Sequence, residues 1–325
     1  DAMTLNDALG EGQTYRLTGI GPVAGFTEGS DFFRANFSDF ELQEIDSAFD
    51  SAVEDFAVAE DIMAGYLLGR WESADLRVVY GLRYEHTDNT LVGNNVLLVE
   101  EDGTLPDGSI AADDTVLVSP VSIDKNYDHW LPSLNLRYEP QTDLVLRAGF
   151  YRSIVRPSPF QQAPHFAVEE ADDGERSGEF GNPALLPTEA WNFDAAAEYY
   201  MSATGALHAS VFYKSLDNFI VDVNTDVAGN FRGIAFDEAT IAQNGDEADI
   251  FGIELGFSQA FTGTLDGVVV QANYTFTDAD GTVTTLASEG PRSIPLPATA
   301  KHTANFSVGY DKGPIDIRLS GTYRD

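Results

Sequence analysis

The feature that most constrains this chain is an alternation of apolar and polar residues. In residues 191–199 every second residue is apolar or aromatic, namely Trp191, Phe193, Ala195, Ala197 and Tyr199. Successive side chains of a β-strand point to opposite faces, so this spacing places all five side chains on one face. The pattern predicts a strand whose two faces meet different surroundings.

The same alternation recurs along most of the chain and predicts ten strands. Besides residues 191–199, it covers residues 75–85, 130–139, 144–151, 207–213, 251–257, 268–276, 304–310 and 315–319, and less regularly residues 58–71. Each apolar set has a more polar partner face. Ten such segments predict an all-β fold.

The connections between these segments alternate between short and long. The short ones read WESAD, EPQTD, SATGA, TGTLDG and DKGP, and each is rich in turn-forming residues. The long ones cover roughly residues 91–126, 157–188, 225–248 and 280–299. We therefore expect antiparallel up-and-down strands, with short turns at one end and long loops at the other.

Charge and composition exclude several classes of protein. The chain has 18 basic and 53 acidic residues, a net charge of −35, which argues against nucleic acid as a partner. It has no cysteine, so disulfides and cysteine metal sites are excluded. There is no apolar run long enough for a transmembrane helix, and the opening DAMTLNDALG lacks the pattern of a signal peptide. Acidic runs such as EEDG, EEADDGE and NGDEAD lie in the long connections.

One helix is expected before the first strand. Ser38 followed by Glu41 forms a capping-box pattern, and Ile45, Phe49, Ala52 and Phe56 then fall on one face. We interpret residues 1–56 as a loop region with a short acidic helix, and residues 57–325 as the β-domain.

Alternation alone also fits a soluble barrel or a large β-sandwich with an aromatic core. Two features favour a membrane barrel. The strands have about ten residues, the length that crosses an outer membrane at a tilt. Aromatic residues on one face are spaced eight apart, as in Trp130 and Tyr138 or Trp191 and Tyr199. Eight residues rise roughly 20 Å along the barrel axis, which is close to the height of the apolar band between two aromatic girdles.

Several motifs resemble a known family. YRSIVRPSPF resembles a strand end that leads into a long loop, and GNPALLPTEAWNFDAAAEYY resembles the entry into the next strand. FGIELGF and PLPATAKHTANFSVGYDKGPIDIRLSGTYRD resemble later strands in the same order. Together they are similar to the C-terminal β-barrel of TonB-dependent outer-membrane receptors, in the branch common in Caulobacter- and Xanthomonas-like bacteria.

The resemblance implies a transmembrane antiparallel barrel with long extracellular loops, in the outer membrane of a Gram-negative cell. It implies active uptake of a scarce ligand, such as siderophore-bound iron or an oligosaccharide, rather than an enzyme. The implied partners are outer-membrane lipid, the extracellular ligand, and the TonB complex through an N-terminal part. The family has a plug and 22 strands, so ten strands imply a fragment without the plug or the final strands. The alternatives are a passive porin-type channel and, less favoured, a β-barrel enzyme.

No metal or cofactor is predicted. The five histidines do not have metal-ligand spacing, and no nucleophile motif is present. The order of Arg156–Pro157, His165 and the NPAL sequence at 182–185 is similar to haem receptors of the family, but the first box lacks its pattern.

Two groups of functional residues follow from this interpretation. The polar strand faces are expected to line the lumen, with Arg77, Arg83, Asn135, Arg137, Arg147, Asn192, Asp194, Glu198, Glu254, Asn273 and Arg318. Loops carry specificity more often than scaffolds do. The ligand-binding candidates therefore cluster in or beside one long loop, and they are Arg152, Arg156, Phe160, His165, Phe166, Arg176 and Phe180.

Overall fold

The computed structural model describes residues 14–15, 18–19, 27–40, 42–171, 174–284, 290–296 and 299–325. The chain divides into two compact units, Asp1–Ser51 and Ala52–Asp325. The first unit contains the two-residue strands β1 (Thr14–Tyr15) and β2 (Thr18–Gly19), helix α1 (Glu28–Ala35) and a 3₁₀ turn at Phe37–Asp39. Helix α2 (Glu44–Glu54) crosses the boundary.

The expected acidic helix is present, but it starts later than the capping-box pattern indicates. Ser38 lies in the 3₁₀ turn, Glu41 lies outside the described residues, and α2 begins at Glu44. The ring of Phe33 packs against Phe37 and Phe40, with centroid distances of 5.4 and 4.9 Å, which holds this segment in a turn. Helix α1 has no counterpart among the helices expected from the sequence.

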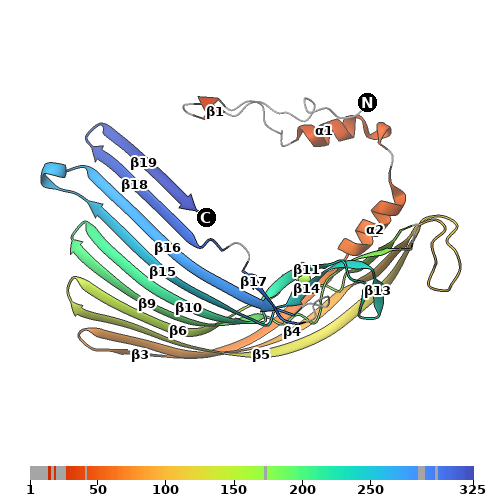
Figure 1. Cartoon of the computed structure of the whole chain (residues 1–325), viewed down its shortest axis with the longest axis horizontal. Helices are drawn as coiled ribbons and strands as arrows, with labels where there is room; N and C mark the ends of the chain where they lie inside the picture. The colour runs from red at the N-terminus through yellow and green to blue at the C-terminus, as the bar shows by residue number, and fades with distance from the viewer. Residues whose placement is uncertain are drawn as a thin grey trace. The chain divides into compact units, whose positions relative to one another are not determined.

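The second unit is built on ten antiparallel strands in chain order (Figure 1). They are β3 (Ala57–Glu72), β4 (Leu76–Val99), β5 (Thr115–Gln141), β6 (Leu144–Val155), β9 (Thr188–Ser202), β10 (Gly205–Asp217), β15 (Glu247–Ala260), β16 (Val268–Val283), β18 (His302–Lys312) and β19 (Ile315–Arg324). Short turns lie at one end, which confirms the predicted up-and-down arrangement. Among the described strands, β3 and β19 each pair with one neighbour, so the barrel is not closed.

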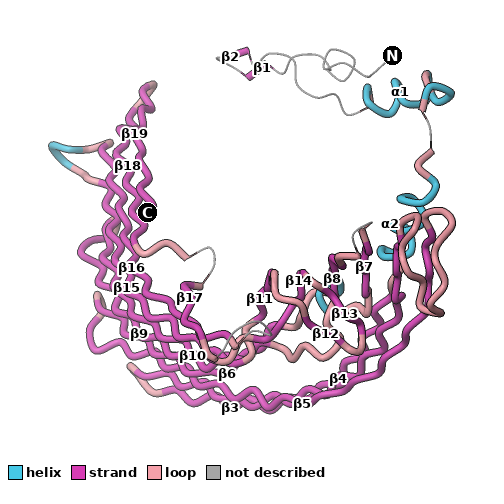
Figure 2. Tube along the Cα trace, turned by 45° about the vertical axis from the view of Figure 1, so that its right-hand side comes forward, coloured by secondary structure: helices cyan, strands magenta, loops and turns pink. Residues whose placement is uncertain are grey.

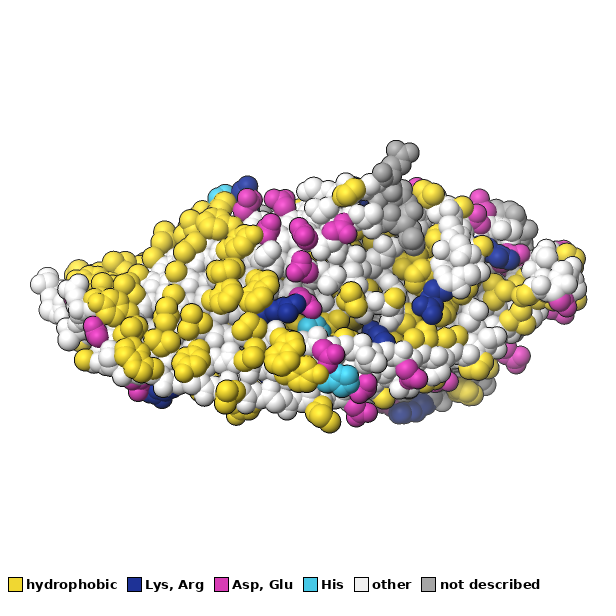
Figure 3. Space-filling model, turned by 90° about the horizontal axis from the view of Figure 1, so that it is seen from below, with side chains coloured by type: hydrophobic (Ala, Val, Ile, Leu, Met, Phe, Trp, Pro, Cys, Tyr) yellow, Lys and Arg dark blue, Asp and Glu magenta, His cyan; other side chains and the backbone are white. Residues whose placement is uncertain are grey.

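The sheet is curved, and its two faces differ as the alternation predicts (Figure 2). Hydrophobic side chains form a broad band on the convex face, and charged side chains become frequent toward the long-loop end (Figure 3). Large residues such as Trp130, Tyr138 and Leu255 are exposed on the apolar face, at 55, 40 and 49%. An exposed apolar face of this extent marks an interaction surface. No helix in the described ranges is long and apolar enough to cross a membrane.

Several strands carry a glycine directly opposite an aromatic residue. The register pairs Gly69 with Tyr80, Gly252 with Phe212 and Gly321 with Phe306. A Cβ atom added at these glycines would lie 2.1–2.4 Å from the facing ring. The rings therefore cover the glycine backbone, an arrangement that stabilises curved sheets.

The structure departs most from the sequence prediction in the long connections, parts of which form strands where loops were expected. Strands β4 and β5 extend well beyond the predicted segments, so only residues 100–114 of the expected loop 91–126 connect them. The extension is held by β7 (Phe166–Glu170), which pairs in parallel with the end of β4. Leu91, Val96 and Val99 are fully buried there.

Two long connections, between β6 and β9 and between β10 and β15, join into what we call the loop sheet. Strand β7 pairs with β8 (Arg176–Phe180), β8 pairs in parallel with β14 (Glu238–Asn244), and β14 pairs with β11 (Ile220–Thr225). The hairpin of β12 (Gly229–Phe231) and β13 (Ile234–Phe236) packs on it. Figure 2 shows these strands on the concave side of the large sheet. The remaining elements are helix α3 (Pro159–Gln162), the 3₁₀ turn Gly263–Leu265 and β17 (Arg292–Pro295), which pairs with β16.

Candidate functional site

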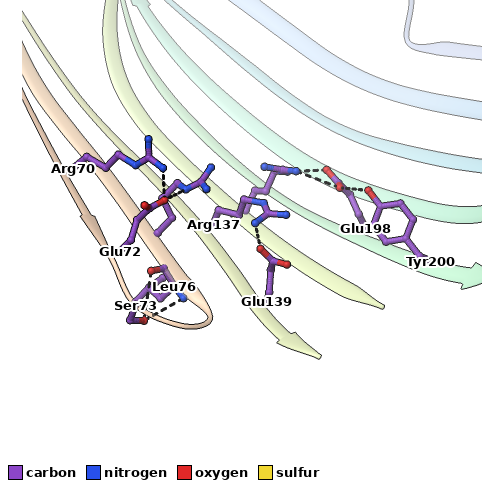
Figure 4. Close-up of polar contacts among 10 residues, drawn as sticks. Arg70, Glu72, Ser73, Leu76, Arg137, Glu139, Glu198 and Tyr200 are labelled. Atoms are coloured by element: carbon purple, nitrogen blue, oxygen red, sulfur yellow. Dashed lines mark hydrogen bonds and ion pairs between the residues drawn. The ribbon is translucent and has the colours of Figure 1, made fainter. Parts of the chain in front are cut away.

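The concave face carries a cluster of arginine–carboxylate pairs near the short turns (Figure 4). Arg77, Arg137 and Arg147 lie directly opposite one another on β4, β5 and β6. Like charges in such positions repel unless each is compensated. Glu72 binds Arg77 and, at 2.5 Å, Arg70, while Glu139 binds Arg137.

Glu198 compensates the third arginine of this row. It accepts bonds of 2.8 and 3.4 Å from Arg147, and the Tyr200 hydroxyl donates to the same carboxylate at 2.9 Å. These carboxylates neutralise most of the positive charge of the row. The arrangement favours a rigid wall over a free anion-binding surface.

The other predicted lumen residues also follow the polar face. Asn135 and Asp194 line a pocket of about 350 Å³ together with Arg77, Arg137 and Arg147. Asn192 is buried and donates to Ser153 Oγ at 3.0 Å, and Glu254 accepts from Ser210 at 3.1 Å. Asn273 and Arg318 lie on the same face by the strand register.

A second polar network lies where β6 leaves the sheet. Arg156 Nη2 donates to Glu85 Oε2 at 2.7 Å and to Thr87 Oγ1 at 3.2 Å, and Arg156 Nε lies 3.3 Å from Glu60 Oε1. Glu85 is only 8% exposed and also accepts from Arg83 at 2.6 Å. Arg156 thus links the start of the loop between β6 and β9 to strands β3 and β4.

Buried polar atoms accompany this network. Asn89 is 2% exposed, and neither of its amide atoms has a hydrogen-bond partner among the described residues. His129 is similarly buried and contacts Glu189 through Nε2 at 3.0 Å, while its Nδ1 lacks a partner there. Sequence reasoning missed Glu60, because only the three-dimensional pairing brings it to Arg156. It also missed the burial of Asn89 and His129.

His165 lies in an apolar environment within the same loop. Its ring stacks on Phe160 at a centroid distance of 4.3 Å, and Phe56 lies 6.4 Å away. The side chain is 1% exposed, and burial lowers the pKa of the imidazole below its usual value. The packing of this loop therefore favours the neutral form of His165.

The remaining ligand-binding candidates are not all in one place. Phe166 and Phe180 are buried in the hydrophobic core of the loop sheet. Arg176 binds the buried carboxylate of Glu170 at 2.6 Å. Arg152 pairs with Glu189 and lies over the ring of Trp191 at 5.7 Å, on the apolar face of the strands.

Two asparagines that sequence reasoning missed fasten the loops together. Asn182 donates to the Ala242 carbonyl at 2.9 Å, and its own backbone N–H donates to Gln161 O at 2.7 Å. Asn244 accepts from Leu186 N at 2.8 Å and donates to Leu186 O at 2.9 Å. The GNP sequence was the available signal for Asn182, since Asn before Pro often organises a turn.

Within the described residues, no group of three or more His, Asp or Glu side chains is placed to hold a metal ion.

Comparison with known protein families shows to which family the chain belongs. The family model described as TonB dependent receptor-like, beta-barrel matches residues 3–325. The chain belongs to the TonB-dependent receptor family. This is a family of transport receptors rather than enzymes. No curated protein sequence is significantly similar to the chain.

Solved structures of TonB-dependent receptors share the fold. The hemophore receptor HasR of Serratia marcescens, as a double mutant in complex with its hemophore HasA and heme, is 12% identical with a TM-score of 0.56. The ferric-catecholate import receptor Fiu of E. coli K12 is 16% identical with a TM-score of 0.53. The FrpB iron transporter of Neisseria meningitidis is 15% identical with a TM-score of 0.50.

These matches cover 82, 83 and 86% of this chain, but only 43, 34 and 35% of the respective solved chains. The chain therefore spans less than half the length of these structures. At such low identity the likeness concerns the fold alone.

Proposed function

We propose that the chain forms part of an outer-membrane receptor that takes up a scarce extracellular ligand with energy from the TonB complex. The observation that carries the proposal is the family match over residues 3–325, together with ten strands that are apolar outside and polar inside. Lipid covers the convex face, residues 1–56 belong to an extracellular loop region, and residues 57–325 belong to the barrel. The TonB complex acts through a part of the receptor outside this chain.

The ligand enters at the mouth that the loop sheet borders. Of the seven candidates, Phe160 is 39% exposed, and we assign it to direct contact with the ligand. Buried His165, Phe166 and Phe180 hold the surrounding loops in place. Arg156 and Arg176 support the same loops through their ion pairs. Arg152 instead pairs with Glu189, between strands β6 and β9.

Cysteine labelling tests the membrane placement, since the chain contains no cysteine of its own. Asn135 and Leu136 are consecutive residues of β5, so their side chains point to opposite faces. In outer membranes containing the full-length receptor, we expect a charged thiol reagent to label Asn135→Cys and to spare Leu136→Cys. Equal labelling, or the reverse order, would contradict the proposed placement.

Uptake is tested separately in cells that produce the full-length receptor, with and without the TonB protein. A panel of iron-loaded chelates and labelled saccharides serves as the set of probes. We expect uptake of one probe to require TonB. Uptake that persists without TonB would favour a passive channel instead.

A further inference from the structure

The segment of residues 157–165, which we call the strap, lies along the concave side of β4. At one end of the strap, Arg156 Nη2 donates to Glu85 Oε2 at 2.7 Å. At the other end, Pro164 lies over Gly93, where an added Cβ would meet the Pro164 carbonyl oxygen at 2.8 Å. Glu85 and Gly93 share one face of β4, because they are an even number of residues apart. The strap therefore covers this face of β4 from Glu85 to Gly93.

Side chains, rather than strand pairing, hold the strap on β4. Strand β6 ends at Val155 and β7 begins at Phe166, so the strap itself belongs to no strand. Helix α3 lies within the strap, and its capping box joins Ser158 to Gln161 inside the same segment. The backbone bonds to residues 181–182 also stay within the loop between β6 and β9. The strap can therefore lift from β4 without breaking a strand pairing.

The strap and the part of β4 beneath it bury polar atoms without pairing them. Asn89 lies between Glu85 and Gly93 on the covered face, and neither of its amide atoms has a partner among the described residues. On the strap, Gln162 Oε1 and His165 Nδ1 lack partners in the same part of the chain. Each of these three side chains is at most 3% exposed. Unpaired polar atoms are therefore concentrated in one short contact.

These unpaired atoms make the closed position of the strap costly. A polar group has hydrogen bonds to water while it is exposed, and it loses them when it is buried without a partner. Lifting the strap restores hydration to Asn89. By contrast, Asn192 on β9 is equally buried, but its amide donates to three acceptors, including Ser153 Oγ at 3.0 Å. Burial of an asparagine therefore carries this cost at Asn89 and not at Asn192.

Two sets of contacts offset this cost and hold the strap down. At its start, Arg156 compensates the buried carboxylate of Glu85. Along the strap, the rings of Phe160 and His165 pack against Phe56, with centroid distances of 6.0 and 6.4 Å. The closed position is therefore a balance between these contacts and the unpaired polar atoms.

We propose that the strap is a conformational switch, which lifts from β4 in the native receptor and uncovers Asn89 beside the carboxylates of Glu60 and Glu85. Asn89 lies directly opposite Glu60 in the register of β3 and β4. The closed and lifted positions are close in free energy, because Arg156 and the aromatic contacts oppose the cost of the unpaired atoms. The inference goes beyond the proposed uptake function, since the strap lifts without a ligand and without TonB.

The test measures how often the strap lifts in the purified full-length receptor in detergent. A small uncharged thiol reagent labels Leu91→Cys, and mass spectrometry quantifies the labelled peptide. Leu91 is fully buried and shares the covered face of β4 with Asn89. Val99→Cys is the reference, because Val99 is equally buried but lies beneath the paired strand β7. Chymotrypsin cleavage after Phe160 is a second measurement that needs no introduced cysteine.

We expect Leu91→Cys to react faster than Val99→Cys. Asn89→Leu removes the unpaired amide and keeps the space filled, so it should slow both the labelling of Leu91→Cys and the cleavage after Phe160 by about tenfold. Asn192→Leu is the matched control. It breaks satisfied hydrogen bonds, so it should lower the thermal stability of the receptor and slow neither rate.

Two results would overturn the inference. One is labelling of Leu91→Cys no faster than that of Val99→Cys, which would mean that the strap does not lift separately from the paired strands. The other is an Asn89→Leu variant whose rates are unchanged or faster, which would mean that ordered water satisfies the amide in the closed position. Gln162→Leu makes the same change on the strap itself and covers the case in which Asn89→Leu does not fold. Uptake in cells is measured separately, so the proposed function can survive this failure.

Discussion

At the scale of single residues, Arg156 has the most consequential environment. Its guanidinium satisfies the buried carboxylate of Glu85 and reaches Glu60 on a different strand. Removing one partner of a buried ion pair leaves an uncompensated charge, which costs far more than the pair itself contributes. The main effect of replacing Arg156 is therefore the buried carboxylate of Glu85 that loses its compensating charge.

We expect Arg156→Met to destabilise the loop between β6 and β9 by about 3 kcal/mol, because Glu85 is left buried and under-compensated. Hydrogen exchange of β7 and β8 in the full-length receptor measures the effect. The double variant Arg156→Met with Glu85→Gln should recover much of the loss. A single variant with unchanged exchange would show that Arg156 does not hold the loop.

His165 makes the same loop sensitive to pH. Burial lowers the pKa of His165 in the closed loop, whereas an opened loop has the ordinary value of about 6.5. The stabilisation is complete above pH about 6.5 and is lost as the pH falls, because only the open state then takes up the proton. Limited proteolysis of residues 156–187 should speed up below that pH. His165→Phe should remove this pH dependence, and a variant that keeps it would point to another group.

The sequence predicts which face of a strand a side chain occupies better than it predicts what that side chain does. The alternation placed Arg77, Arg137 and Asn135 on the polar face because one period controls every strand. Proximity along the chain grouped Arg152 with Arg156, but Arg152 lies over Trp191 on the apolar face. Neighbours in a loop share no fixed direction, so sequence distance alone does not bring their side chains together.

At the scale of elements, the opposed glycine and aromatic residues support the curvature of the sheet. A Cβ at Gly252 would lie 2.1 Å from the ring of Phe212, so the ring has to move. We expect Gly252→Ala to destabilise the barrel by about 1–3 kcal/mol, the usual cost of overpacking. Gly256→Ala, four residues along the same strand, is the matched control, because its Cβ meets nothing closer than 3.5 Å.

Thermal unfolding in detergent compares the two variants. Equal stability of both would contradict the role assigned to the aromatic ring.

The loop sheet should behave as one unit. Phe180 is 2% exposed in a core shared by β7, β13 and β14, so Phe180→Ala should cost about 3–5 kcal/mol through cavity formation. Hydrogen exchange should accelerate together in β7, β8, β11 and β14, while β9 and β10 keep their protection. Acceleration confined to β8 would show that the loops move independently.

Sequence patterns foresaw the ten strands but not the loop sheet, for a physical reason. Antiparallel neighbours are joined by short turns, so their signals are local and periodic. Strands β8 and β14 pair in parallel across some 60 residues, and their side chains meet in a core that includes Phe166, Phe180 and Ile241. No local period in the sequence encodes such a contact. The extension of β4 likewise depends on β7, which lies far along the chain.

At the scale of the whole molecule, the sheet ends in two strands with free outer edges in the part of the chain that the structure describes. Free edges leave backbone N–H and C=O groups without partners, which is costly in lipid. We expect alternate amides of β3 and β19 to exchange faster than those of β9 and β10 when this chain alone is placed in detergent. In the full-length receptor the difference should disappear. Equal protection in the isolated chain would indicate that the two edges find partners there.

The parallel pairings between loops bear on how such a receptor acquires a new specificity. An insertion in β8 would displace β7 and β14 at once, because the three strands share one register. Tolerated variation should instead accumulate in segments outside the shared register, such as residues 100–114 and the turn between β12 and β13. Changes at these tips would leave the paired framework that carries them intact.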